Sequence, residues 1–183
     1  MKDNISTIPF VDLKAPINEL REPIEQVLNS IVSSASFILG PALIDFEKKF
    51  ADYIGTKEAI GVASGTDALT LSFQALDIGL DDEVLIPANT FFATAIGVQL
   101  AGAVPVPVDI DPRTFLMDLQ DASRRVGKKT KAIAPVHLYG MASDMDALSG
   151  FAEAHGLYIV EDAAQSHGAE WNGRKTGSFG NTG

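Results

Sequence analysis

Two acidic residues, Glu161 and Asp162, directly follow the apolar stretch 157–160. If that stretch is a strand, its end brings both carboxylates to the edge of a sheet. A carboxylate at a buried edge needs a cationic partner, because burying an unpaired charge is costly. Side chains alternate along a strand, so the two acids point to opposite faces. We therefore do not expect them to act together as a catalytic carboxylate pair.

A second candidate is the stretch 64–67, Ser-Gly-Thr-Asp, which lies between a short apolar run and a helical pattern. Gly65 would let a ligand approach the backbone, and the free N–H groups at a helix start attract anions such as phosphate. The spacing alone favours a simpler alternative, in which Ser64 and Asp67 form a capping box and nothing binds.

Two further segments carry residues that could contact a ligand. Phe91, in the stretch 87–92, could stack on a flat heterocycle, although a phenylalanine at a helix start more often belongs to the core. His137, in the stretch 135–140, could touch a ligand, although a single histidine of this kind is more often hydrogen-bonded in place. Taken singly, none of these segments specifies a function.

The elements that would position these residues alternate between strands and helices. Strands are expected at 59–63, 83–86, 104–108, 132–136 and 157–160, and helices at 18–34, 41–54, 64–77, 91–100, 118–126 and 143–154. Pro23 falls in the first turn of the first helix, Asp118 caps another, and 143–146 has capping-box spacing. A hairpin is expected at 168–175, around Asn172-Gly173.

This order predicts an α/β fold with three αβα layers and a mostly parallel sheet. In such sheets, ligands bind beyond the carboxyl ends of the strands, where all four segments lie. With 183 residues, the chain is long enough for one well-buried domain.

Composition excludes several classes of protein. A net charge of −10 argues against nucleic-acid binding, and the absence of cysteine excludes disulfides, thiolate metal sites and cysteine nucleophiles. No metal site is expected. The stretch 84–108 has no charged residue, but its prolines and polar residues indicate strands, a loop and a helix rather than a membrane span. No signal peptide is recognisable, so a cytosolic protein is expected.

Three phrases match one known family in order and spacing: Ser-Gly-Thr-Asp-Ala-Leu at 64–69, Pro-Ala-Asn-Thr-Phe at 87–91 and Glu-Asp-Ala-Ala-Gln at 161–165. Flanking phrases at 10–14, 37–41, 108–112 and 137–140 agree. The chain thus resembles the DegT/DnrJ/StrS aminotransferases over nearly its whole length. The resemblance implies the large domain of an aspartate aminotransferase-like fold (fold-type I) and the cofactor pyridoxal phosphate (PLP).

The resemblance also implies a role for each matching residue. Gly65 and Thr66 would hold the PLP phosphate at the helix N-terminus, and Phe91 would stack on the pyridine ring. Asp162, the catalytic residue, would pair with the protonated ring nitrogen, which makes the ring an electron sink. Gln165 would hydrogen-bond the phenolic oxygen of the ring. The histidines at 137 and 167 receive no role.

Family members mostly transaminate nucleotide-linked keto-sugars in a ping-pong reaction, with glutamate as the usual amino donor. The N-terminal sequence motifs and their spacing look most like those of the branch that acts on C3 of dTDP- or UDP-linked keto-sugars. Members pair as homodimers with each active site at the subunit interface, so a homodimer is expected here.

One family feature is not matched. The Schiff-base lysine of the family lies roughly ten residues past the hairpin, and Lys175, inside the hairpin, does not match it. Residues 1–183 are therefore expected to be an incomplete large domain without the small C-terminal domain, inactive by themselves. Two alternatives stay open: a PLP-dependent sugar dehydratase, in which histidine replaces that lysine, and a non-catalytic module that binds PLP or a nucleotide sugar.

Overall fold

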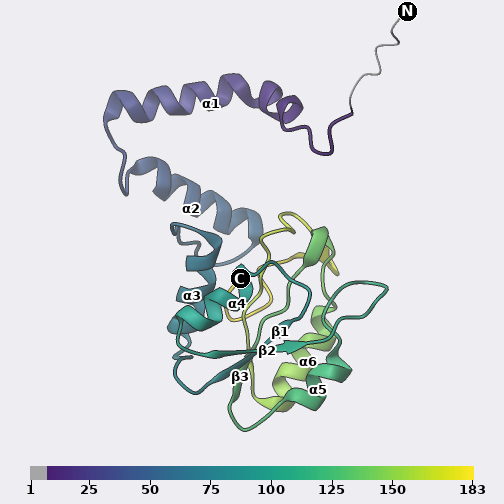
Figure 1. The fold of residues 1–183 in the computed structure, drawn as a ribbon. Coiled ribbons are helices and arrows are strands. Elements are labelled where there is room, and N and C mark those ends of the chain that lie inside the picture. Colours follow the sequence, from purple (N-terminus) through teal and green to yellow (C-terminus); the bar gives the residue numbers. More distant parts are fainter. Residues whose placement is uncertain (1–7) are drawn as a thin grey trace, which may run out of the picture. The chain divides into compact units, whose positions relative to one another are not determined.

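The computed structural model describes residues 8–183, which belong to two compact units, one up to Phe46 and one from Glu47 onward. The first unit contains helix α1 (Lys14–Ser34) and the start of helix α2 (Pro41–Ile54). The second unit contains the sheet and the other helices (Figure 1).

Helix α1 begins earlier than its apolar pattern predicts. The helix starts at Lys14 rather than at 18, so Pro16 occupies the first turn and Pro23 lies in the helix interior. The prediction that Pro23 sits in a first turn is wrong. Proline lacks the N–H that an interior helical position donates, so the helix continues past Pro23 with one backbone hydrogen bond fewer.

Four parallel strands form the central sheet. They are β1 (Glu83–Pro87), β2 (Val104–Val108), β3 (Thr130–Ile133) and β4 (Tyr158–Ile159), and their order is β2-β1-β3-β4. The connecting helices are α3 (Gly65–Ala75), α4 (Ala93–Leu100), α5 (Leu119–Arg125) and α6 (Met145–His155), with a 3-10 turn, η1, at Leu138–Gly140. The predicted parallel α/β fold is confirmed, and the ends of these strands and helices lie within three residues of the predicted ends.

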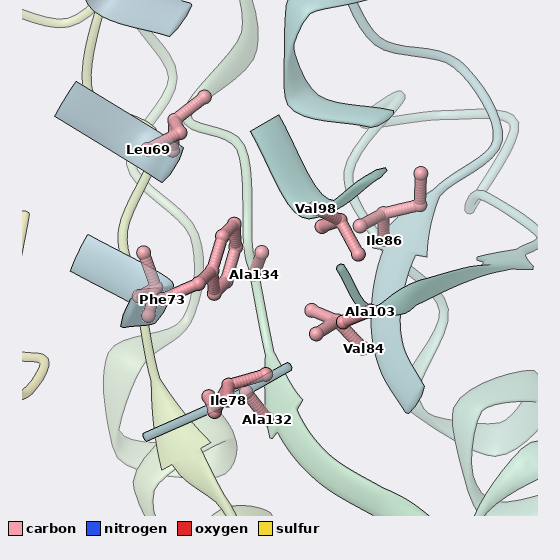
Figure 2. Close-up of a cluster of buried hydrophobic side chains, with 10 residues drawn as sticks. Leu69, Phe73, Ile78, Val84, Ile86, Val98, Ala103, Ala132 and Ala134 are labelled. Carbon is pink, nitrogen blue, oxygen red and sulfur yellow. The ribbon is translucent and has the colours of Figure 1, made fainter. Parts of the chain in front are cut away.

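The alternation of side chains along the strands creates a core on each face of the sheet. Val84 and Ile86 of β1 pack with Phe73 of α3 and Val98 of α4, as Figure 2 shows. Leu85, between them, packs on the opposite face. There the core also includes Ala122 of α5 and Met145, Leu148 and Ala152 of α6. The sheet therefore lies between two helical layers (Figure 1).

Helices α3 and α4 pack closely because of a glycine. A Cβ atom built on Gly97 would lie 2.8 Å from the Cβ of Leu69, which is closer than real contacts allow. Only a residue without a side chain lets the two helices approach this far.

The predicted strand at 59–63 is wrong. Nothing in the four-stranded sheet pairs with this segment, and Ile60 is 80% exposed. The backbone N–H of Gly61 instead donates to the Glu47 carboxylate at 2.7 Å. An apolar run becomes a strand only when a neighbouring strand accepts its hydrogen bonds, and the described chain provides none here.

The local signals for turns and caps are mostly confirmed. Asp118 caps α5, and a two-stranded hairpin, β5 (Glu170–Trp171) and β6 (Arg174–Lys175), turns at Asn172 and Gly173, which have φ values of 50° and 78°. These positive φ values are those of a type I′ turn. No helix in the described part of the chain is long and apolar enough to cross a membrane.

The capping box expected at 143–146 is wrong in one respect. Asp144, not Ser143, caps α6, by accepting a hydrogen bond from the N–H of Ala147 at 2.9 Å. Ser143 is buried, and its backbone N–H donates to the ring of His137 instead. Ser143 thus contacts His137 rather than the helix, and Asp144, the next residue along the chain, caps α6.

Candidate functional site

A cavity of about 260 Å³ lies at the carboxyl ends of β1, β3 and β4, where the fold predicts a ligand site. The start of α3 forms one side of it. Its walls contain all five residues that sequence reasoning singled out: Gly65, Thr66, Phe91, Asp162 and Gln165. Thr90, Ala93, Val136 and Ala164 complete the lining. The structure therefore brings together four chain segments that are far apart in sequence.

The start of α3 presents backbone donors to this cavity. Ser64 caps the helix by accepting from the N–H of Asp67 at 3.1 Å, as the simpler alternative predicted. The N–H groups of Gly65 and Thr66 belong to the first helical turn and donate to no acceptor among the described residues. A Cβ on Gly65 would meet nothing within 4 Å, so the missing side chain leaves these donors open. The cap and an anion site are thus compatible.

Phe91 does not belong to the core. Its side chain is 73% exposed although it lines the cavity, so the alternative that it packs inside the protein is wrong. An aromatic face left open beside a cavity can stack on a flat ring.

Asp162 is held from one side and open on the other. The hydroxyl of Thr94 donates to Asp162 Oδ2 at 2.7 Å, and the N–H of Ala164 donates to Oδ1 at 3.3 Å. Thr94 is fully buried and lies 2.9 Å from the hydroxyl of Thr90, which also lines the cavity. Sequence reasoning missed Thr94. Its signal was a hydroxyl in the apolar helix 93–100, four residues after Thr90.

Gln165 has a fixed orientation. The backbone N–H of Tyr139 donates to Gln165 Oε1 at 3.0 Å. A backbone N–H can only donate, so the amide oxygen faces Tyr139 and the NH2 group is free to donate elsewhere. Gln165 is therefore suited to an acceptor atom in the cavity.

Glu161 points away from the cavity, as alternation predicted, but its partners are not cations. His137 Nε2 lies 3.0 Å from Glu161 Oε2, and three backbone N–H groups also donate to the carboxylate. Burial raises the pKa of Glu161, but the hydrogen bonds from His137, Gly180 and Gly177 outweigh it and leave the pKa lowered. His137 itself is fully buried and hydrogen-bonded in place, so it does not contact the cavity.

No lysine of the described chain lines the cavity. Lys175 pairs with Glu170 at 3.7 Å and lies over the ring of Tyr53, at 4.9 Å from its centroid. This placement agrees with the interpretation that Lys175 is not a cofactor lysine. Among the described residues, no three His, Asp or Glu side chains gather in a way that could hold a metal ion.

Comparison with known proteins identifies the family. The model of the DegT/DnrJ/EryC1/StrS aminotransferase family matches residues 18–183. The chain belongs to this family. It is 44% identical over 173 residues to the dTDP-3-amino-3,6-dideoxy-alpha-D-galactopyranose transaminase of Aneurinibacillus thermoaerophilus, covering 94% of this chain and 48% of that protein. It is 45% identical over 178 residues to the UDP-N-acetyl-3-dehydro-alpha-D-glucosamine 3-aminotransferase of Acidithiobacillus ferrooxidans, covering 97% and 48%.

Solved structures of the family share the fold. DesV of S. venezuelae superposes with a TM-score of 0.91 at 44% identity, over 93% of this chain and 46% of that one. NtdA of Bacillus subtilis, solved with the bound cofactor PMP, gives 0.88 at 37% identity, over 96% and 41%. The family uses PLP, of which PMP is the amino form. The chain spans about half the length of the relatives that it matches.

Proposed function

We propose that residues 1–183 form the PLP-binding large domain of a nucleotide-sugar aminotransferase. The observation that carries this proposal is the convergence of five suitable groups on one cavity. They are two free N–H donors at a helix start, an exposed aromatic face, a carboxylate and an amide with a free NH2 group. Each of these would meet a different part of PLP.

The residues fit the cofactor one by one. Gly65 and Thr66 would bind the phosphate through their N–H groups, where the helix dipole favours an anion. The open space beside Gly65 is the volume that this phosphate would need. Phe91 would cover one face of the ring. The free NH2 of Gln165 would donate to the phenolic oxygen.

Asp162 would accept a hydrogen bond from the protonated pyridine nitrogen and so keep the ring cationic. When bound, PLP supplies an electron sink that stabilises negative charge on a neighbouring carbon. A carboxylate at the ring nitrogen favours this protonated form, because an opposite charge nearby raises the affinity of the nitrogen for its proton. The hydroxyl of Thr94 holds Oδ2 of Asp162 at 2.7 Å and so restricts the rotation of the carboxylate.

The substrate class follows from the names of the relatives. Enzymes named for dTDP- and UDP-linked sugars aminated at position 3 are 44–45% identical to this chain. We therefore propose a nucleotide-linked keto-sugar as substrate and glutamate, the usual donor of the family, as amino donor.

We also propose a homodimer and a cytosolic location. Phe37, Ile38 and Leu39 are three consecutive apolar residues that are largely exposed. A contiguous exposed apolar patch of this kind marks a surface that another chain covers.

Binding of PLP to the 183-residue chain tests the proposal. The chain is mixed with PLP and desalted, and retained absorbance of the cofactor is compared between wild type and Gly65→Ala. We expect retention by wild type and a clear loss in the variant. Equal retention by both would point to adducts on surface lysines and contradict this site.

The two alternatives are separated in the full-length protein. Reduction with borohydride should fix PLP covalently if a lysine holds it, as in an aminotransferase. A histidine at the corresponding position, with no covalent fixation, would favour the sugar dehydratase. Binding of PLP without turnover of any keto-sugar would favour the non-catalytic module.

A further inference from the structure

Glu161 is the most completely bonded side chain next to the cavity, yet it does not reach it. Its Oε1 accepts from the N–H groups of Phe179 and Gly180, both at 2.6 Å. Its Oε2 accepts from the N–H of Gly177 at 2.8 Å and contacts His137 Nε2 at 3.0 Å. The side chain is fully buried. The Glu161 carboxylate thus accepts hydrogen bonds from three backbone N–H groups of the turn 177–180.

The backbone fixes the tautomer of His137. The N–H of Ser143 donates to His137 Nδ1 at 3.0 Å, so Nδ1 is an acceptor and carries no proton. The proton of the neutral ring is then on Nε2, which donates to Glu161. All four groups that face Glu161 are therefore donors, and only a side chain with two acceptor oxygens satisfies them.

The strand end that carries Asp162 is bonded on both sides. The N–H of Glu161 donates to the carbonyl of Thr182 at 3.0 Å, and the N–H of Asp162 donates to the carbonyl of Pro135 at 2.9 Å. The N–H of His137 returns a hydrogen bond to the carbonyl of Asp162 at 3.1 Å. Segments 135–137 and 177–182 thus lie on the two sides of this strand end and bond its backbone. The hydrogen bonds of the His137 and Glu161 side chains connect the same two segments.

The turn also supports the segment that lines the cavity. A Cβ built on Gly177 would lie 3.5 Å from the Cβ of Ala163, between Asp162 and Ala164. The hydroxyls of Ser166 and Thr176 lie 2.9 Å apart, both buried. The turn therefore packs behind segment 162–165, which supplies Asp162 and Gln165 to the cavity.

We propose that Glu161 and His137 are positioning residues of this site: the buried carboxylate and the neutral imidazole hold the turn 177–180 and, through it, segment 162–165 in the geometry that the cofactor needs. That a cofactor needs this geometry rests on the proposed function. The positioning itself is measurable without a cofactor.

Replacing Glu161 by glutamine tests the requirement for two acceptors. A glutamine amide has the shape of the carboxylate but one oxygen only. Whichever way it turns, its NH2 group faces two donors, either Phe179 and Gly180 or Gly177 and His137. A buried donor without an acceptor destabilises the closed turn, so the turn should open locally.

Amide hydrogen exchange, followed by NMR in the 183-residue chain, gives the readout. In Glu161→Gln, the amides of Gly177, Phe179 and Asp162 should exchange about tenfold faster or more, while those of Val84 and Ile133 keep wild-type rates. Wild-type rates at the turn would overturn the proposal. Equal acceleration of all amides would overturn it too, because that shows a general loss of stability rather than positioning.

A matched pair at His137 decides the matter if Glu161→Gln does not fold. A glutamine at 137 can place its NH2 near the position of Nε2, whereas an asparagine is too short and can only replace Nδ1. His137→Asn should therefore accelerate exchange at Gly177 and Asp162 more than His137→Gln does. Equal rates in the two variants would contradict a role for the bond to Glu161.

PLP titration then connects the positioning to the cofactor. Glu161→Gln should bind PLP at least about fivefold more weakly than wild type, since segment 162–165 is no longer held. Unchanged affinity would contradict the link to the cofactor. If wild type does not bind PLP, the proposed function fails for this chain, and the exchange rates still decide whether Glu161 positions the segment.

Discussion

Glu161 and Asp162 are neighbours in sequence but differ in how their oxygens are bonded. The oxygens of Glu161 accept four hydrogen bonds and are fully buried, on the face turned toward the turn 177–180. Asp162 accepts one bond from Thr94 and a longer one from Ala164, and the rest of its carboxylate faces the cavity. One carboxylate is saturated by the protein, and the other keeps acceptor capacity for a ligand.

This difference teaches how one strand end serves two purposes. A saturated buried carboxylate contributes to the local structure, because removing it strands several donors at once. An unsaturated one at a cavity can act on a bound molecule. The two roles predict opposite effects of substitution: a less stable turn for Glu161 and a lower turnover for Asp162.

The largest effect is expected for Asp162→Asn in the full-length protein. Loss of the charge at the ring nitrogen should lower turnover by about 10²–10³-fold, a range typical of removing one group that stabilises charge in a transition state. Steady-state kinetics measure it, and thermal unfolding should show a fold of wild-type stability. Normal turnover would refute the role of Asp162.

Glu161→Gln should show the reverse pattern. At neutral pH, the free energy of local opening of the turn 177–180 should fall by about 1.4 kcal/mol or more, the equivalent of tenfold faster exchange, because buried donors lose their acceptor. Amide exchange at Gly177 and Phe179 measures it, with Glu170→Gln, an exposed acid of the hairpin, as the matched control. A turn that opens no more readily than in wild type would remove the contrast between the two carboxylates.

The pH dependence of that loss gives a second check. The pKa of Glu161 in the folded chain lies below its ordinary value of 4.5, so its stabilisation is present above that pH and is lost as pH falls through the folded pKa. The difference between wild type and Glu161→Gln in the free energy of opening the turn 177–180 should therefore narrow below about pH 4.5. A gap that widens in acid would mean that the carboxyl group is protonated in the folded state.

Gly65→Ala should affect binding alone. A Cβ at this position meets nothing within 4 Å, so the fold should be unchanged. The methyl group would occupy the space beside the free N–H groups and weaken the affinity for PLP by about tenfold, the equivalent of one charge-assisted hydrogen bond. Isothermal titration measures the affinity, and an unaltered dissociation constant would place the phosphate elsewhere.

The smallest effect is expected for Thr94→Val, which keeps the shape but removes the donor to Asp162 Oδ2. The carboxylate gains rotational freedom, and turnover in the full-length protein should fall about fivefold, with the affinity for PLP less affected. Thr70→Val, which removes a hydroxyl that bonds only its own helix, is the control. Equal effects of both variants would contradict the positioning of Asp162 by Thr94.

Local signals in the sequence predicted much of this structure. The Asn172-Gly173 turn and the cap at Asp118 depend on backbone preferences of a few neighbouring residues, so they are readable without the fold. The parallel sheet follows from the alternation of strands and helices. The five cavity residues were found because the chain resembles a known family, whereas each segment alone was ambiguous.

What the sequence did not predict depends on partners far along the chain. Segment 59–63 has the composition of a strand but no neighbour to pair with. Glu161 was expected to need a cation, and its donors are instead the backbone of a turn sixteen to nineteen residues later. Thr94 contacts Asp162 across sixty-eight residues. No local pattern encodes such contacts, because they exist only when the sheet has formed.

The most direct test of the central claim is an NMR titration of the labelled 183-residue chain with pyridoxamine phosphate, which lacks the aldehyde that would react with surface lysines. The amide signals of Gly65 and Thr66 should shift on addition of pyridoxamine phosphate and should shift far less with pyridoxamine, which has no phosphate. Signals at these two amides that stay unmoved, or that respond equally to both compounds, would contradict a cofactor phosphate at the start of α3.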